Sequence, residues 1–138
     1  MNLDQAQNRV ANFMVAGGQL DERPENYRIP DREVFQRRVN MLQEEIQELI
    51  AAWVDGDIVG VADAWGDLLY VLLGGVEEAG FDIAPVFGVI AEANDKKIDW
   101  TAEPARPFVT REDGKILKPE GWVGPEERIA HILEGAGQ

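Results

Sequence analysis

Residues 58–76 read IVGVADAWGDLLYVLLGGV and form the one long apolar stretch of the chain. The stretch carries two aspartates, Asp63 and Asp67, and four glycines. Charged and flexible residues inside so short a span favour a buried helix over a membrane-spanning one. Because the segment is apolar on nearly every side, we expect a central bundle helix from Ile58 to about Gly75.

Two further helices are predicted upstream by apolar residues at steps of three and four. The first covers about residues 3–16 and ends at the Gly17–Gly18 pair. Residues 19–30 hold two prolines and predict a loop. Asp31 is a candidate N-cap for the second helix. The apolar residues of this helix follow alternating steps of four and three, a pattern suited to packing against other helices. They are Phe35, Val39, Leu42, Ile46, Leu49 and Trp53.

The downstream half predicts one more long helix and an irregular extension. Asp82 can cap the fourth helix, which tolerates Pro85 in its first turn. The segment VTREDGKIL, residues 109–117, is typical of a short hairpin, and a last helix is expected over 125–133. The predicted fold is all-α, a four- to five-helix bundle. We expect a single domain over 1–138, in which residues 100–138 form a loop-rich extension with the hairpin.

Composition excludes several classes of function. The 138 residues include 13 basic and 26 acidic ones, a net charge of −13 that repels nucleic-acid polymers. The absence of cysteine excludes disulfides, thiolate nucleophiles and zinc fingers. The single histidine, His131, makes a His-dependent triad or a di-iron bundle a poor hypothesis. The N-terminus MNLDQAQNRV resembles no secretory signal, so we expect a cytoplasmic protein without a membrane partner.

Carboxylates are the residues in excess, and three of them share one side of the second predicted helix. At about 100° per residue, Glu44, Glu45 and Glu48 fall within an arc of about 100°. A solvated acidic flank would have the same pattern. The triplet alone therefore does not decide between a metal site and an ordinary helix surface.

The aspartates of the apolar helix favour a metal site over an ordinary acidic helix surface. Asp63 and Asp67 lie one turn apart, and a carboxylate in such surroundings needs a cation, hydrogen-bond donors or a proton. Capping by Arg or Lys is the simpler alternative. Facing Glu44, Glu45 and Glu48, however, the pair would be compatible only with a multivalent cation. Because every ligand is a hard oxygen, the set favours Mg²⁺, or Mn²⁺ in its place, and hence phosphate-ester or phosphoanhydride chemistry.

A polar end of the fourth helix fits an anionic substrate. Asn94 and Lys97 extend the stripe of Phe87 and Ile90 beyond its apolar part. Lys97 could neutralise a phosphate oxygen, and a salt bridge to a nearby carboxylate is the equal alternative.

Taken together, these motifs carry a family resemblance. EExxE at 44–48 followed by Asp67 in DAWGDLLYVLLG resembles the MazG-like nucleotide pyrophosphohydrolase superfamily. The order of motifs over about residues 10–125 more closely resembles its phosphoribosyl-ATP-pyrophosphohydrolase-like branch, through GGQ, EEIQEL, DAWGDLLYVLLG, FDIAPVF, EANDKK and REDGKILKP. This resemblance implies an all-α, Mg²⁺-dependent enzyme that cleaves a nucleoside triphosphate between its α and β phosphates.

The resemblance also assigns roles to residues. Glu44, Glu45, Glu48 and Asp67 fall on metal positions. The usual ExxD motif has Ala64 in place of its Glu, so Asp63 is the candidate substitute. Either Glu44 or Glu45 is expected to be the general base. Candidate substrate-binding residues are Asn94, Lys97, Arg111, Lys115, Lys118 and Trp122.

Other expectations concern the tryptophans, the assembly and the alternative functions. Core packing is the favoured role of Trp53 and Trp65, and Trp122 is open to base stacking. The helix seams predict a homodimer or homotetramer. Two alternatives to a nucleoside triphosphate pyrophosphohydrolase stay open: phosphoribosyl-ATP hydrolysis in histidine biosynthesis, and a non-catalytic acidic module that binds a partner through its helices.

Overall fold

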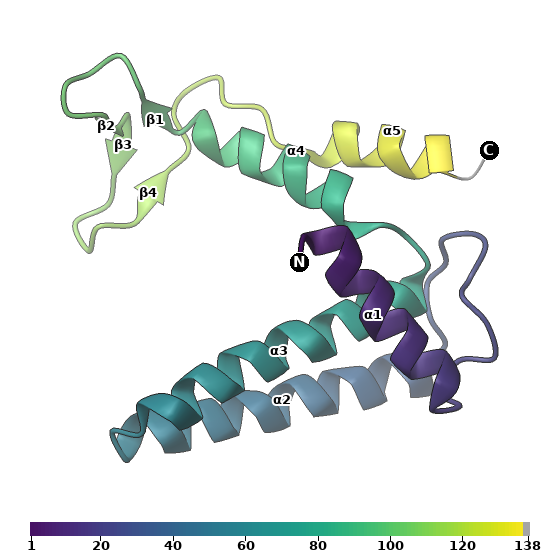
Figure 1. Ribbon diagram of the computed structural model, residues 1–138. Helices are drawn as coiled ribbons and strands as arrows, with labels where there is room; N and C mark the ends of the chain where they lie inside the picture. Colours follow the sequence, from purple (N-terminus) through teal and green to yellow (C-terminus); the bar gives the residue numbers. More distant parts are fainter. Residues whose placement is uncertain (137–138) are drawn as a thin grey trace. The chain divides into compact units, whose positions relative to one another are not determined.

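The computed structural model describes residues 1–136, in which five helices and two short strand pairs form (Figure 1). The prediction of an all-α fold with a hairpin-bearing extension is confirmed. The described residues fall into two compact units, Met1–Ile83 and Ala84–Ala136. One domain over 1–138 stays a prediction, which a single cooperative unfolding transition of the intact chain would support. The helices are α1 Leu3–Ala16, α2 Arg32–Val54, α3 Ile58–Ala79, α4 Ile83–Asp95 and α5 Glu126–Ala136.

The first unit is a helical hairpin crossed by a third helix. Helices α2 and α3 run antiparallel side by side, and α1 lies across the C-terminal half of α3 (Figure 1). The buried centre consists of Val10 and Met14 from α1 and Leu73 from α3. Helix α3 therefore packs against both other helices of this unit, as its apolar composition predicts.

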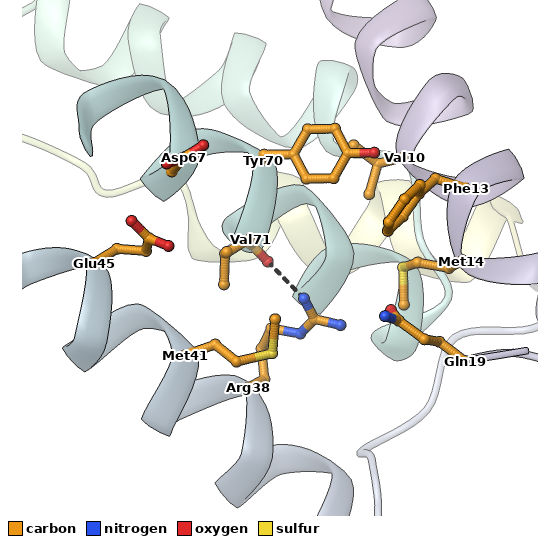
Figure 2. Close-up of a pocket in the computed structure, with 10 residues that line it drawn as sticks. All are labelled: Val10, Phe13, Met14, Gln19, Arg38, Met41, Glu45, Asp67, Tyr70 and Val71. Carbon is orange, nitrogen blue, oxygen red and sulfur yellow. Dashed lines mark hydrogen bonds between the residues drawn. The ribbon is translucent and has the colours of Figure 1, made fainter. Parts of the chain in front are cut away.

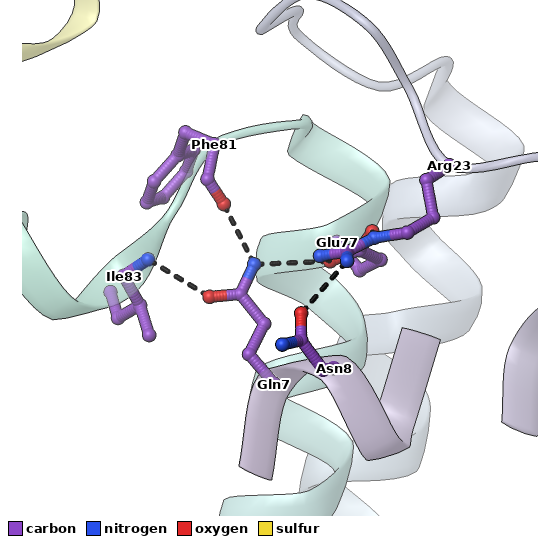
Figure 3. Close-up of polar contacts among 6 residues, drawn as sticks. All are labelled: Gln7, Asn8, Arg23, Glu77, Phe81 and Ile83. Atoms are coloured by element: carbon purple, nitrogen blue, oxygen red, sulfur yellow. Dashed lines mark hydrogen bonds and ion pairs between the residues drawn. The ribbon is translucent and has the colours of Figure 1, made fainter. Parts of the chain in front are cut away.

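A polar network holds α1 and the loop after it against the end of α3 (Figure 3). The side-chain amide of Gln7 donates to Glu77 at 3.0 Å and to the Phe81 carbonyl at 2.9 Å. Its oxygen accepts from the backbone N–H of Ile83 at 3.0 Å. Arg23 in the loop forms an ion pair with the buried Glu77 carboxylate. Each polar group thus has a partner, which offsets the cost of burying it.

A second ion pair joins α2 to α3. Arg38 Nε lies 2.6 Å from Glu78 Oε1, and both side chains are largely buried. A Cβ on Gly74 would lie 2.5 Å from Arg38 Nη1, so this glycine makes room for the guanidinium. The glycines at 74 and 75 thus lie inside α3, and the prediction that the helix ends near Gly75 is wrong. The helix continues to Ala79 and ends at Gly80, whose φ of 79° suits glycine.

Two other local expectations are corrected. Asp31 occupies the N-cap position of α2, but its side chain makes no capping hydrogen bond. Asp57 does cap α3, accepting from Gly60 N–H at 3.0 Å.

Trp53 and Trp65 are 74% and 61% exposed and do not pack in the core. The buried cluster forms where α1 meets the C-terminal half of α3, whereas Trp53 lies in the last turn of α2, beside the hairpin turn.

Helix α3 is also long and apolar enough to cross a membrane by length and composition alone. Its sequence and contacts give a different account of its apolar character. The helix packs along α2 and against α1, and it carries the ion-paired Glu77 and Glu78. These are features of a helix inside a folded protein.

The second unit begins with α4 and contains both strand pairs. The predicted hairpin is present: β3 Val109–Thr110 pairs with β4 Ile116–Leu117, and Gly114 in its turn has a φ of 91°. A second pair, β1 Ile98–Asp99 with β2 Arg106–Pro107, was not predicted because two-residue strands have no periodicity to detect. Helix α5 connects to α4 through the Arg128–Glu92 ion pair.

Gly80 provides a test of how closely residues 24–26 pack against the C-terminal end of α3. A Cβ there would lie 2.5 Å from the Asn26 carbonyl oxygen, in a left-handed backbone. Gly56 has a similar φ of 66° but open space around it. We expect Gly56→Ala to lower the free energy of unfolding by about 1–2 kcal/mol. Gly80→Ala should lower it by about 1–3 kcal/mol more, through the added clash. Urea denaturation measures both, and equal losses would contradict the close packing of residues 24–26 on α3.

Candidate metal and substrate site

Three carboxylates from two helices come together in the first unit. Glu45 and Glu48 of α2 and Asp67 of α3 each offer an oxygen, and these atoms lie within 4.8 Å of one another. Glu45 and Asp67 are half-buried, and Glu48 is exposed. We call these three residues the carboxylate trio. The spacing is suited to a single cation held between them.

The trio forms because the two helices approach closely near their connection. The turn at Asp55–Asp57 reverses the chain with Gly56 in a left-handed conformation. A Cβ on Gly60 would lie 3.0 Å from Ala52 Cβ, so small residues bring the backbones together at this end. Local sequence thus places the two acidic faces opposite each other.

Electrostatics within the trio disfavour three negative charges. Burial, followed by the neighbouring carboxylates of Glu48, Asp67 and Asp63, raises the pKa of Glu45. Glu45 Oε2 is buried and has no hydrogen-bond partner in the part of the chain that the structure describes. An unpartnered buried oxygen beside two other carboxylates fits a bound cation. The donor set of hard oxygens fits Mg²⁺ or Mn²⁺.

The other two predicted metal residues lie outside the trio. Asp63 is exposed one turn before Asp67, near enough to act on the Glu45 charge. Glu44 is exposed on α2, about 40° around the helix from Glu48. The structure therefore brings three of the five predicted carboxylates together and leaves Asp63 and Glu44 at the periphery.

Four predicted substrate-binding residues meet in the second unit. The Trp122 indole N–H donates to the Ala93 carbonyl at 2.7 Å, which fixes the ring. The ammonium groups of Lys97 and Lys118 lie 4.9 and 5.2 Å from the ring centroid. Lys97 also donates to Asn94 Oδ1 at 2.8 Å. We call these residues, Asn94, Lys97, Lys118 and Trp122, the lysine–tryptophan cluster.

The remaining two candidates lie in the hairpin. Arg111 makes two hydrogen bonds to the Asp113 carboxylate, and this pairing lowers the pKa of Asp113. Lys115 follows in the same turn, where its backbone N–H also donates to Asp113. The turn thus uses Arg111 in a local ion pair, and it presents Lys115 as an exposed cation.

Comparison with known families gives a match over a segment that contains the trio. The profile of the phosphoribosyl-ATP pyrophosphohydrolase family matches residues 15–94, more than half of the chain. The chain belongs to this family. It is thus a member of the MazG-like all-α nucleotide pyrophosphohydrolases, hydrolases that act on phosphorus-containing anhydrides. The match includes all of the trio and ends at Asn94. A search of curated proteins gave no match.

Sequence reasoning missed the residues that surround the trio on the α1 side. Arg38, Gln19 and Tyr70 line a pocket that also reaches Glu45 and Asp67 (Figure 2). They come from three separate segments, so no local motif links them. The only signal was Gln19 in the GGQ motif, which carried no assigned role.

The raised pKa of Glu45 predicts the direction in which the stability of this pyrophosphohydrolase changes with pH. Without metal, the folded state holds a proton on Glu45 at pH values where the unfolded chain has lost it. Stability should therefore fall as pH rises from the ordinary glutamate range through the raised pKa. Glu45→Gln should remove this fall, raise the neutral-pH melting temperature in EDTA and weaken the stabilisation by Mg²⁺.

Thermal unfolding across mildly acidic to neutral pH, in EDTA and in Mg²⁺, measures these effects. Glu44→Gln is the matched control, because Glu44 lies on the same helix outside the trio. Equal behaviour of the two variants would show that Glu45 holds no special position.

Proposed function

We propose that this enzyme hydrolyses a nucleoside or deoxynucleoside triphosphate to the monophosphate and pyrophosphate, with Mg²⁺ at the carboxylate trio. The observation that carries the proposal is the convergence of Glu45, Glu48 and Asp67 in a chain of this family. A chain of net charge −13 needs cations to hold a triphosphate. Mn²⁺ offers the same coordination chemistry and should substitute.

The trio of Glu45, Glu48 and Asp67 would hold the metal, which would offset phosphate charge and favour ionisation of the attacking water. Glu44 flanks the trio and is proposed as the general base that takes a proton from the attacking water. The water oxygen forms a bond to the α-phosphorus, and the bond from that phosphorus to the α–β bridging oxygen breaks. The electron pair leaves with pyrophosphate. Glu44→Gln should therefore lower kcat while stabilisation by Mg²⁺ persists.

The lysine–tryptophan cluster is proposed to contact substrate phosphates. Two ammonium groups gather around one ring in a strongly acidic protein, and no ion pair involves either lysine in residues 1–136. Such a pair of cations favours a bound anion. Within the cluster the Trp122 ring is open to base stacking, and Arg111 and Lys115 are proposed as further contacts to phosphate or base.

Phosphoribosyl-ATP is the second candidate substrate, because the matching family carries that name. It has the same triphosphate, and its cleavage would use the same trio. The third possibility raised by the sequence, a non-catalytic interaction module, does not fit a family of hydrolases.

A second copy of the chain is the proposed partner for exposed apolar surface on the helical hairpin. Large apolar side chains of the hairpin that are exposed by about half or more include Trp53, Val54, Ile58, Val59, Trp65 and Leu69. An exposed apolar surface of this kind is typical of an interface. Light scattering should give the mass of a dimer or tetramer, and a monomer would contradict the assembly. A nucleotide substrate agrees with the expected cytoplasmic location.

The products and the metal requirement test the reaction. Attack at the α-phosphorus releases monophosphate and pyrophosphate in one step, so diphosphate should not accumulate. Activity should disappear in EDTA and return with Mg²⁺ or Mn²⁺. Chromatography of the products from (deoxy)nucleoside triphosphates and phosphoribosyl-ATP measures both effects. Diphosphate as the product, or full turnover in EDTA, would contradict the proposal.

The two aspartates of α3 give a further test. Asp67→Asn removes a trio charge and should lower kcat by about 100-fold or more, the scale of a lost transition-state contact. Its stability without metal should hold or rise, because like-charge repulsion falls. Asp63→Asn should weaken Mg²⁺ affinity if Asp63 substitutes for the missing glutamate and should otherwise have little effect. Rates across a Mg²⁺ titration decide between these outcomes, and normal Asp67→Asn turnover at low Mg²⁺ would rule out the trio.

A further inference from the structure

A pocket of about 340 Å³ in the first unit extends from the carboxylate trio toward α1 (Figure 2). Figure 2 shows Glu45 and Asp67 on one side, and Phe13 and Gln19 on the other. The guanidinium of Arg38 lies between them. The volume is within the range of small-molecule sites. A ligand bound here would have one end beside the trio and the other beside α1.

The far side of the pocket is aromatic and apolar. The rings of Phe13 and Tyr70 have centroids 5.6 Å apart at an interplanar angle of 79°. Both residues are about half-exposed, 55% and 42%, so their ring surfaces are accessible. Met41 adds adaptable apolar surface. Such walls suit a flat aromatic group, which gains stacking energy on either ring.

Two polar side chains give the pocket a chemical preference. Arg38 is held by Glu78 through Nε and by the Val71 carbonyl through Nη1, at 3.3 Å. Its Nη2 donates no hydrogen bond to residues 1–136 and can donate to a ligand. Gln19 can donate and accept through its amide. Arginine offers donors only, so the ligand edge that faces Arg38 must carry acceptors.

We propose that this pocket binds the nucleoside of the substrate, with the base against Phe13 and Tyr70 and the triphosphate directed to the trio. Arg38 and Gln19 are the specificity-determining residues. With purine C6 or pyrimidine C4 directed to Arg38, the expected bases are guanine, uracil and thymine, which carry a carbonyl at that position, whereas adenine and cytosine carry an amino group there. This inference rests on the proposed function and extends it to a class of base.

The same chemistry separates the two candidate substrates. Phosphoribosyl-ATP carries an adenine, whose exocyclic nitrogen would place a donor toward the Arg38 donor. It would also need room for a second phosphoribosyl group. The pocket therefore favours a plain nucleoside triphosphate whose base is guanine, uracil or thymine.

Steady-state kinetics in Mg²⁺ tests the pocket. For the wild type, kcat/KM should be higher for GTP, UTP and dTTP than for ATP and CTP. Tyr70→Leu and Gln19→Leu should raise KM for GTP by about tenfold, the scale of one lost base contact, with kcat within about threefold. Tyr70→Phe keeps the ring and should behave like the wild type. Phe108→Leu removes an exposed aromatic outside the pocket and should leave both constants unchanged.

Inorganic tripolyphosphate separates the pocket from the metal site, because it has no nucleoside. Its inhibition constant in Mg²⁺ should be the same in the wild type, Tyr70→Leu and Gln19→Leu. Loss of tripolyphosphate binding in these variants would mean a structural role and would overturn the pocket assignment.

Two other outcomes separate the pocket proposal from the proposed function. Nucleotide hydrolysis with unchanged KM in both variants, or a wild-type preference for ATP and CTP, would overturn the pocket proposal alone. No hydrolysis of any nucleoside triphosphate by the wild type would overturn the proposed function.

Discussion

The buried ion pair between Arg38 and Glu78 fixes the register of α2 on α3, and the site depends on that register. Glu45 follows Arg38 by seven residues, about two turns, so it lies on the same face of α2. Asp67 precedes Glu78 by eleven residues, about three turns, on the same face of α3. The attraction between Arg38 and Glu78 thus helps to hold the mutually repelling carboxylates of the trio together elsewhere on the same helical hairpin. Breaking a buried pair of this kind leaves an uncompensated charge in the interior.

The sequence predicts the helices well because their signals are local. Apolar periodicity locates α1, α2 and α4, the long apolar run locates α3, and the Asp113–Gly114 turn locates the hairpin. Errors arise where a distant residue decides the local structure. Gly75 looks like a helix end, yet Arg38 from another helix occupies the space that the glycine pair leaves. Trp53 looks like a core residue, yet the buried cluster lies farther along the hairpin.

The candidate site is predictable in part for the same reason. Glu45, Glu48 and Asp67 belong to motifs whose spacing shows which helix face they share, and the structure brings them together. The difference between Glu45 and Glu44 depends on which side chain faces α3, which the helix period alone does not settle. The pocket beside the trio needs three segments in contact at once. Only the folded chain could reveal it.

The immobilised Trp122 ring gives the protein an optical property. Three of its four tryptophans, Trp53, Trp65 and Trp100, are at least 61% exposed, so their indoles are largely solvated. Trp122 differs, since its N–H is fixed on the Ala93 carbonyl and two ammonium charges lie about 5 Å from its ring. Charges so near an indole alter the energy of its excited state. The emission of this residue is therefore an intrinsic, label-free reporter of where the lysine charges lie.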